Sequence, residues 1–127
     1  MEHSELTERI IGCAMTVHKA LGPGFIESVY RTAFAHEMRK AGLTVEREKA
    51  IVVTYDGIVA GEFFADMLVE STILVEVKGG LSLAIAHEVQ LVNYLTATGL
   101  DIGLLINFGG KSLTFKRLVL SNFRDHV

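Results

Sequence analysis

Residues 66–78 read DMLVESTILVEVK, which is two apolar runs separated by the polar pair Glu70-Ser71. A polar break between two apolar runs predicts two strands that fold back on each other. Side chains two residues apart lie on the same face of a strand, so Glu76 and Lys78 are expected to project together. The turn would also bring Asp66, at the head of the first run, toward Glu76.

Two carboxylates and an amine at the end of a sheet suit a hard divalent metal and a water nucleophile. Glu76 follows an apolar run, and a buried carboxylate is costly unless it is paired or bound to a metal. We therefore favour a functional site formed by Asp66, Glu76 and Lys78 over a surface salt bridge at a strand end.

The composition predicts one folded domain over residues 1–127, because half of the residues are hydrophobic and only 21% are charged. The net charge of -3 provides no general attraction for nucleic acid, although a bound metal or a local basic patch can supply it. Cys13 is the only cysteine, which excludes an intrachain disulfide and a thiolate zinc cluster within one chain. No apolar run approaches the ~20 residues of a membrane helix, and the N-terminus lacks a signal-peptide layout, so a cytoplasmic protein without a membrane partner is expected.

Hydrophobic periodicity and turn residues predict the element order ααβββαββ, which is an α/β domain containing a βαβ unit. Ser4 is expected to cap the first helix, and Asp56-Gly57 is a strong hairpin-turn signal. The run 102–108 is nearly all apolar, which is typical of a central strand buried on both faces. The expected helices span residues 4–19, 25–41 and 82–98, and the expected strands span residues 45–55, 58–69, 73–78, 102–108 and 112–120.

For three further residues, Glu27, Gln90 and Tyr94, an ordinary structural role explains the position at least as well as a function does. Glu27 falls in the first turn of the second helix, where the helix dipole favours an acid in any case. Gln90 and Tyr94 are four residues apart and share a helix face, which is expected to differ from the apolar face of Ile85 and Val89. An exposed polar face would explain Gln90 without any function.

Five motifs together resemble the GxxExxY protein family, a branch of the PD-(D/E)XK nuclease superfamily. The resemblance covers about residues 10–119, with the motifs in order. It implies a restriction-endonuclease-like αβββαβ core with a mixed central sheet flanked by helices. The motifs are Gly24-x-x-Glu27-x-x-Tyr30, Ala65-Asp66-Met67-Leu68-Val69, Val75-Glu76-Val77-Lys78, His87-Glu88-Val89-Gln90-Leu91-Val92-Asn93-Tyr94-Leu95 and Gly103-Leu104-Leu105-Ile106-Asn107-Phe108-Gly109.

The resemblance implies a Mg²⁺- or Mn²⁺-dependent phosphodiesterase that acts on nucleic acid, either DNA or RNA. The implied metal ligands are Asp66, Glu76 and the backbone carbonyl of Val77, with Lys78 as the catalytic lysine. Glu27 is implied to hold a water or a second ion.

The pair Gln90-x-x-x-Tyr94 is similar to a motif of exonuclease-like superfamily members, and implies that both side chains position water, phosphate or Lys78. Phe64 and Gly79-Gly80 depart from the family, whose members often carry an arginine before Ala-Asp and Lys-Ala-x-Glu after the glutamate. The first departure removes a phosphate-binding arginine.

Two other hypotheses stay open at this point. A non-catalytic nucleic-acid- or protein-binding module could keep the nuclease fold, and the acidic net charge favours this alternative. A third hypothesis is purely structural: Glu27, Asp66, Glu76 and Lys78 would form a buried ion network without any function. A chain of this size has little surface for recognition, so a homo-oligomer or a partner protein is expected to supply the rest.

Overall fold

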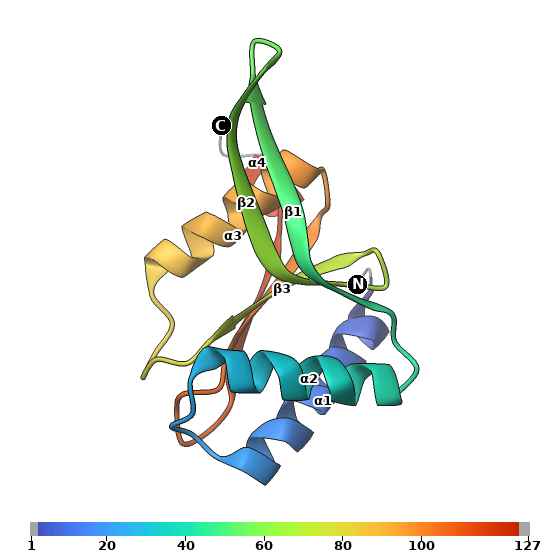
Figure 1. Cartoon of the computed structure of the whole chain (residues 1–127), viewed down its shortest axis with the longest axis vertical. Helices are drawn as coiled ribbons and strands as arrows, with labels where there is room; N and C mark the ends of the chain where they lie inside the picture. Colours follow the sequence, from blue (N-terminus) through green and yellow to red (C-terminus); the bar gives the residue numbers. More distant parts are fainter. Residues whose placement is uncertain (1–2, 125–127) are drawn as a thin grey trace.

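A computed structural model describes residues 3–124, and the remaining ends of the expected domain lie outside the described residues. It confirms the expected α/β fold, in which a five-stranded mixed sheet is flanked by helices (Figure 1). The elements in chain order are α1 (Ser4–Leu21), α2 (Glu27–Lys40), β1 (Val45–Tyr55), β2 (Ile58–Val69), β3 (Ile73–Lys78), α3 (Ile85–Thr98), β4 (Ile102–Asn107), β5 (Thr114–Val119) and α4 (Ser121–Arg124).

The bounds of β1, β2 and β3 and the start of α1 agree with the expected ones, but α2 and α3 begin later than expected, at Glu27 and Ile85. Helix α3 begins at Ile85 instead of residue 82, because the Nδ1 atom of His87 accepts the Ala84 N–H and fixes the first turn there. Ser4 is the first residue of α1 and not its cap, since His3 occupies the cap position. The short α4 was not predicted.

The strands follow one another across the sheet in the order β1-β2-β3-β4-β5. Only β3 and β4 are parallel, and α3 connects them as the expected βαβ unit. Helices α1 and α2 cover one face of the sheet and α3 covers the other (Figure 1).

The core is divided between the two faces of the sheet. On the α1–α2 side, Tyr30 and Phe108 are fully buried and stack with ring centroids 4.9 Å apart. Every residue of β4 is buried, which confirms the central strand expected from the apolar run. The packing therefore places β3 and β4 in the most deeply buried part of the sheet.

The apolar face expected for α3, formed by Ile85, Val89, Val92 and Leu95, is correct at Val92 and Leu95 but wrong at Ile85 and Val89. Ile85 and Val89 are 79% and 53% exposed, whereas Leu91 and Leu95 are fully buried. Helix α3 approaches β4 closely at Gly103, where an added Cβ would lie 2.9 Å from the Leu91 side chain. This close approach, which helical periodicity cannot reveal, selects the buried face.

A long hairpin of β1 and β2 projects from the sheet as an arm (Figure 1). Asp56 and Gly57 both have positive φ at its tip, which confirms the expected hairpin turn. Strand β2 pairs with β3 only over residues 67–69, and then the two strands separate. We call this point the fork, and Asp66 lies at it.

The backbone of the arm is irregular at the fork. The pairing of β1 with β2 skips Glu48 and Asp66, and Glu48 has a φ of 53° inside a strand. Ala65 packs on the α3 side of the sheet whereas Met67 packs on the α1–α2 side, so the usual alternation of side chains is interrupted between them. A local disruption of this kind re-aims one side chain, which here is that of Asp66.

Candidate functional site

The fork is held open by hydrogen bonds of Asp66. Its Oδ2 atom accepts the Val77 N–H at 2.7 Å, so the carboxylate stands where a neighbouring strand would offer a carbonyl. The Asp66 N–H lies 3.4 Å from Oε2 of Glu76. The expected approach of Asp66 to Glu76 is therefore seen in the structure.

Glu76 is a buried carboxyl group with 4% of its surface exposed. Burial, a side-chain hydrogen bond with Asp66 and the charge of Asp66 together raise its pKa to about 9, while the charge of Lys78 acts in the opposite direction. Without another cation the Glu76 carboxyl group keeps its proton at neutral pH. A divalent cation at this position would replace the proton and would satisfy both acids.

Lys78 is the last residue of β3 and lies on the same strand face as Glu76, as expected. Within residues 3–124 no salt bridge joins Lys78 to Asp66 or to Glu76. A closed buried ion network therefore does not account for these three residues.

Glu27 reaches the site from α2 and a tight loop. Its Oε2 atom accepts the Gly79 N–H at 2.9 Å, directly after Lys78. Tyr30 fixes this loop, because its hydroxyl donates to the Gly22 carbonyl at 2.5 Å and accepts the Phe25 N–H at 3.2 Å. The spacing Gly24-x-x-Glu27-x-x-Tyr30 therefore has a structural explanation: Tyr30 anchors the loop from which Glu27 reaches the end of β3.

Arg31 belongs to the site, and the sequence analysis did not identify it. Its Nη1 atom lies 3.5 Å from Oε1 of Glu27 and 3.9 Å from Oδ1 of Asp66. The sequence could have indicated Arg31, because it follows Glu27 by four residues and side chains at this spacing share a helix face.

The loop after Lys78 is fixed by two residues that were also missed. The Asn107 amide donates to the Gly80 carbonyl at 2.9 Å and accepts the Gly109 N–H at 3.1 Å. At Gly109 an added Cβ would lie 2.2 Å from the Gly80 carbonyl oxygen, so only glycine fits. Both residues occur in the last of the five motifs, which was the available signal.

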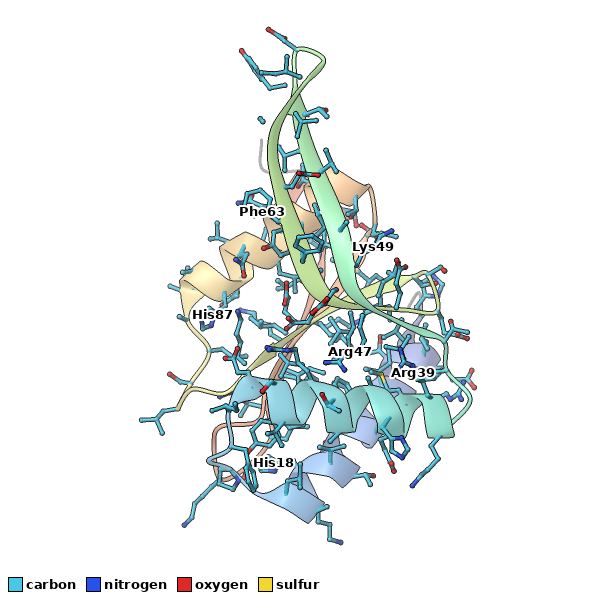
Figure 2. The ribbon with its side chains drawn as sticks, viewed as in Figure 1. His18, Arg39, Arg47, Lys49, Phe63 and His87 are labelled. Carbon is cyan, nitrogen blue, oxygen red and sulfur yellow. The ribbon has the colours of Figure 1, made fainter. Side chains whose placement is uncertain are left out.

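Gln90 and Tyr94 border a groove of about 780 Å³ between α3 and the arm. Phe63 lies on the arm opposite, with its ring centroid 5.9 Å from that of Tyr94 (Figure 2). Val89 lines the same groove, so the expected separation of the Gln90 and Tyr94 face from the Val89 face is wrong. Burial raises the pKa of the Tyr94 hydroxyl, and the charges of Glu76 and Asp66 shift it in the same direction, so the hydroxyl lies within electrostatic range of both acids.

Comparison with known protein families decides the broad identity of this arrangement. The family model of the PD-(D/E)XK nuclease superfamily matches residues 4–118. The chain belongs to the PD-(D/E)XK nuclease superfamily. A search of curated proteins finds no significant match.

The solved structures add support at the level of the fold. This PD-(D/E)XK chain is similar to the crystal structure of SSO0001, with a TM-score of 0.59 and 20% sequence identity. The similarity covers 92% of this chain and 58% of that chain, so this chain spans a little over half the length of the solved protein. None of the described helices combines the length and apolar character that crossing a bilayer requires.

The donor set of this PD-(D/E)XK site suits a cation that accepts few protein ligands. Asp66 and Glu76 offer carboxylate oxygens, which Mg²⁺ and Mn²⁺ prefer. Among residues 3–124, no group of three His, Cys, Asp or Glu side chains is close enough to hold a metal ion. Glu27 is joined to Asp66 through Arg31 and is not a third carboxylate in one cluster. A magnesium ion usually keeps several waters, so two carboxylates and a carbonyl are sufficient.

Proposed function

We propose that the chain is a Mg²⁺- or Mn²⁺-dependent nuclease of the GxxExxY branch, which hydrolyses phosphodiester bonds in nucleic acid. The observation that carries the proposal is the convergence of Asp66 and Glu76 at the fork, with Lys78 on the adjacent strand face. Membership of the nuclease superfamily supports the same reaction.

The metal would be held by the carboxylates of Asp66 and Glu76 and by the Val77 carbonyl. A divalent ion there would acidify water and supply positive charge beside the scissile phosphate. Asp66 is fixed for this task by the Val77 N–H, and Glu76 is fixed by the packing of β3. Ligands that are held before the ion arrives bind it with little loss of conformational entropy.

Lys78 would orient the attacking water or stabilise the charge that develops on the phosphate. Its backbone is fixed on both sides, because its carbonyl accepts the Phe108 N–H and the following Gly79 N–H donates to Glu27. Glu27 would hold a water or a second ion from this position.

Gln90 and Tyr94 would position the phosphate, the water or Lys78 from the wall of the groove. The electrostatic effect of both acids on the Tyr94 hydroxyl supports this role. The GxxExxY assignment is supported by Gly24, which has a φ of 111°, and by the contacts of Glu27 and Tyr30.

The test is to incubate the protein with Mn²⁺ or Mg²⁺ and with single- and double-stranded DNA and RNA. We expect metal-dependent cleavage that Lys78→Ala abolishes, while the exposed-lysine control Lys19→Ala retains it. Thermal unfolding with and without Mn²⁺ then separates the roles, because a ligand that binds the native state raises its stability. Mn²⁺ should stabilise Lys78→Ala as it does the wild type, but not Asp66→Ala.

Each outcome has a different meaning. Equal loss of Mn²⁺ stabilisation in Lys78→Ala and Asp66→Ala would contradict the assigned roles. Binding of nucleic acid without cleavage of any substrate, at high protein concentration, would favour the non-catalytic binding module instead.

A further inference from the structure

A second hollow opens on the α2 side of the fork, apart from the groove beside α3. Its volume is about 320 Å³, and none of its lining residues lines the groove. Its walls come from α2, β1 and β2, and combine two arginines, two acids and an exposed aromatic ring. The residues that line the hollow are Arg31, Arg47, Glu48, Phe64, Ala65 and Asp66.

The two arginines have few partners for their donors. A guanidinium carries five N–H groups in a planar fork that matches the oxygens of a phosphate. Arg47 makes one hydrogen bond within the described chain, to the Thr32 hydroxyl at 3.4 Å. Among residues 3–124, Arg31 makes only the two long ion pairs with Glu27 and Asp66. Most of the donors that line the hollow are therefore free to bind an anion.

The two acids of the hollow, Glu48 and Asp66, do not cancel the attraction of the arginines for an anion. Asp66 is committed to the Val77 N–H and to the cation of the proposed site. Glu48 is exposed, so water screens its charge. Without a metal, the charges of the two arginines balance those of the two acids, and the free guanidinium donors are what bind an anion. A divalent ion at Asp66 would add net positive charge, but the binding does not require it.

Phe64 supplies the aromatic wall. Its side chain is 64% exposed, although it lies in a strand next to a rigid core. Exposed rings beside cationic groups are the pattern by which proteins bind single-stranded nucleic acid, since bases stack on the ring while arginines bind the backbone. A paired base inside a duplex has both faces stacked already and cannot use such a ring.

We infer that this hollow binds one unpaired nucleotide next to the scissile phosphate, with its phosphate on Arg31 and Arg47 and its base on Phe64. The inference rests on the proposed function for the place of the scissile phosphate at Asp66. It deepens that function by naming the substrate class, which is a single strand or a duplex with unpaired nucleotides at the cut.

The experiment measures binding in EDTA, so that it does not depend on cleavage. Fluorescence anisotropy would follow a labelled single strand, as DNA and as RNA, and a blunt duplex of the same sequence. We expect Arg47→Ala to weaken single-strand binding roughly three- to ten-fold and to reduce its salt dependence by the equivalent of about one phosphate contact. Arg9→Ala removes the same charge from α1 and should have little effect.

Phe64→Leu tests the stacking contact while it keeps an apolar side chain. It should weaken single-strand binding about five-fold or more and leave duplex binding unchanged, and Phe64→Trp should restore the affinity. Phe115→Leu is the matched control, because Phe115 is 46% exposed on β5 at the opposite edge of the sheet.

Three results would overturn the inference: equal losses in Arg47→Ala and Arg9→Ala, equal losses of single-strand and duplex binding in Phe64→Leu, or no preference for the single strand. Failure of cleavage in Mn²⁺ would count against the proposed function alone, because the binding measurements contain no metal.

Discussion

At the scale of single residues, the carboxyl group of Glu76 links the fold to the chemistry. It is buried in β3 and faces a second acid, Asp66, so a proton or a cation must accompany it. The environment that makes Glu76 costly in the free protein is the one that would make it a strong ligand.

The shifted pKa of Glu76 predicts how stability depends on pH in EDTA. Its folded pKa is about 9 and its ordinary value is 4.5, so between these values the native state holds a proton that the unfolded chain releases. The stability that Glu76 contributes is complete below about pH 4.5 and is lost as pH rises toward 9. Glu76→Gln has no such proton, so its advantage over the wild type should grow with pH.

The measurement is the unfolding free energy of wild type and Glu76→Gln at several pH values from 5 to 8, by urea denaturation. The difference should change by on the order of 1 kcal/mol per pH unit. Any change in unfolding free energy that the new amide causes at every pH does not affect this slope. A difference that does not vary with pH would show that Glu76 is ionised in the native state.

At the scale of elements, the loop that follows β3 depends on the loop that follows β4. Gly109 lies against Gly79 and Gly80 with no room for a side chain, while Asn107 bonds to the Gly80 carbonyl. The two loops therefore hold the end of β3, where Lys78 lies.

Gly109→Ala should destabilise the protein by about 1–3 kcal/mol, because the new methyl group must displace the backbone of Gly79 and Gly80. It should also lower the rate of cleavage, since the displaced loop adjoins Lys78. Gly80→Ala is the control, because its nearest neighbour would be 3.8 Å away. Thermal unfolding of both variants checks the prediction, and equal losses would contradict it.

The loop before α2 offers a second test at this scale. Tyr30→Phe keeps the ring stacked on Phe108 but removes the hydroxyl that bonds to Gly22 and Phe25. We expect a loss of about 1 kcal/mol in stability and a larger relative loss in cleavage, because Glu27 depends on this loop. Tyr55→Phe removes a hydroxyl from a residue that is 69% exposed and should change neither quantity.

At the scale of the whole molecule, stability is distributed unevenly between the sheet centre and the arm. Strands β3 and β4 are buried on both faces, whereas most side chains of the arm are exposed beyond Ile51 and Ala65. The proposed base contact of Phe64 lies on the arm, and the proposed metal ligands lie where the arm leaves the buried centre of the sheet.

Hydrogen exchange should show this division directly. Backbone amides of residues 52–63 are expected to exchange through local opening, while those of β3 and β4 should exchange only with global unfolding. The check is native-state exchange at several low concentrations of denaturant. Equal opening free energies in the arm and in β4 would show that the arm is part of the same cooperative unit.

The sequence by itself determined the order of the elements from α1 to β5, the bounds of β1–β3, the hairpin turn at Asp56-Gly57 and the placing of Glu76 and Lys78 on one strand face. These features depend on alternation and turn residues that lie next to each other in the chain. The approach of Asp66 to Glu76 was also accessible, because a short turn connects their strands.

Only the tertiary structure decided the fork, the buried face of α3, the raised pKa of Glu76 and the entry of Arg31 into the site. Each arises where residues distant in sequence meet: Glu48 lies across from Asp66, Leu91 packs against Gly103, and Arg31 reaches from α2 to Asp66. Periodicity describes one element at a time, whereas burial, desolvation and ion pairing depend on which elements face each other.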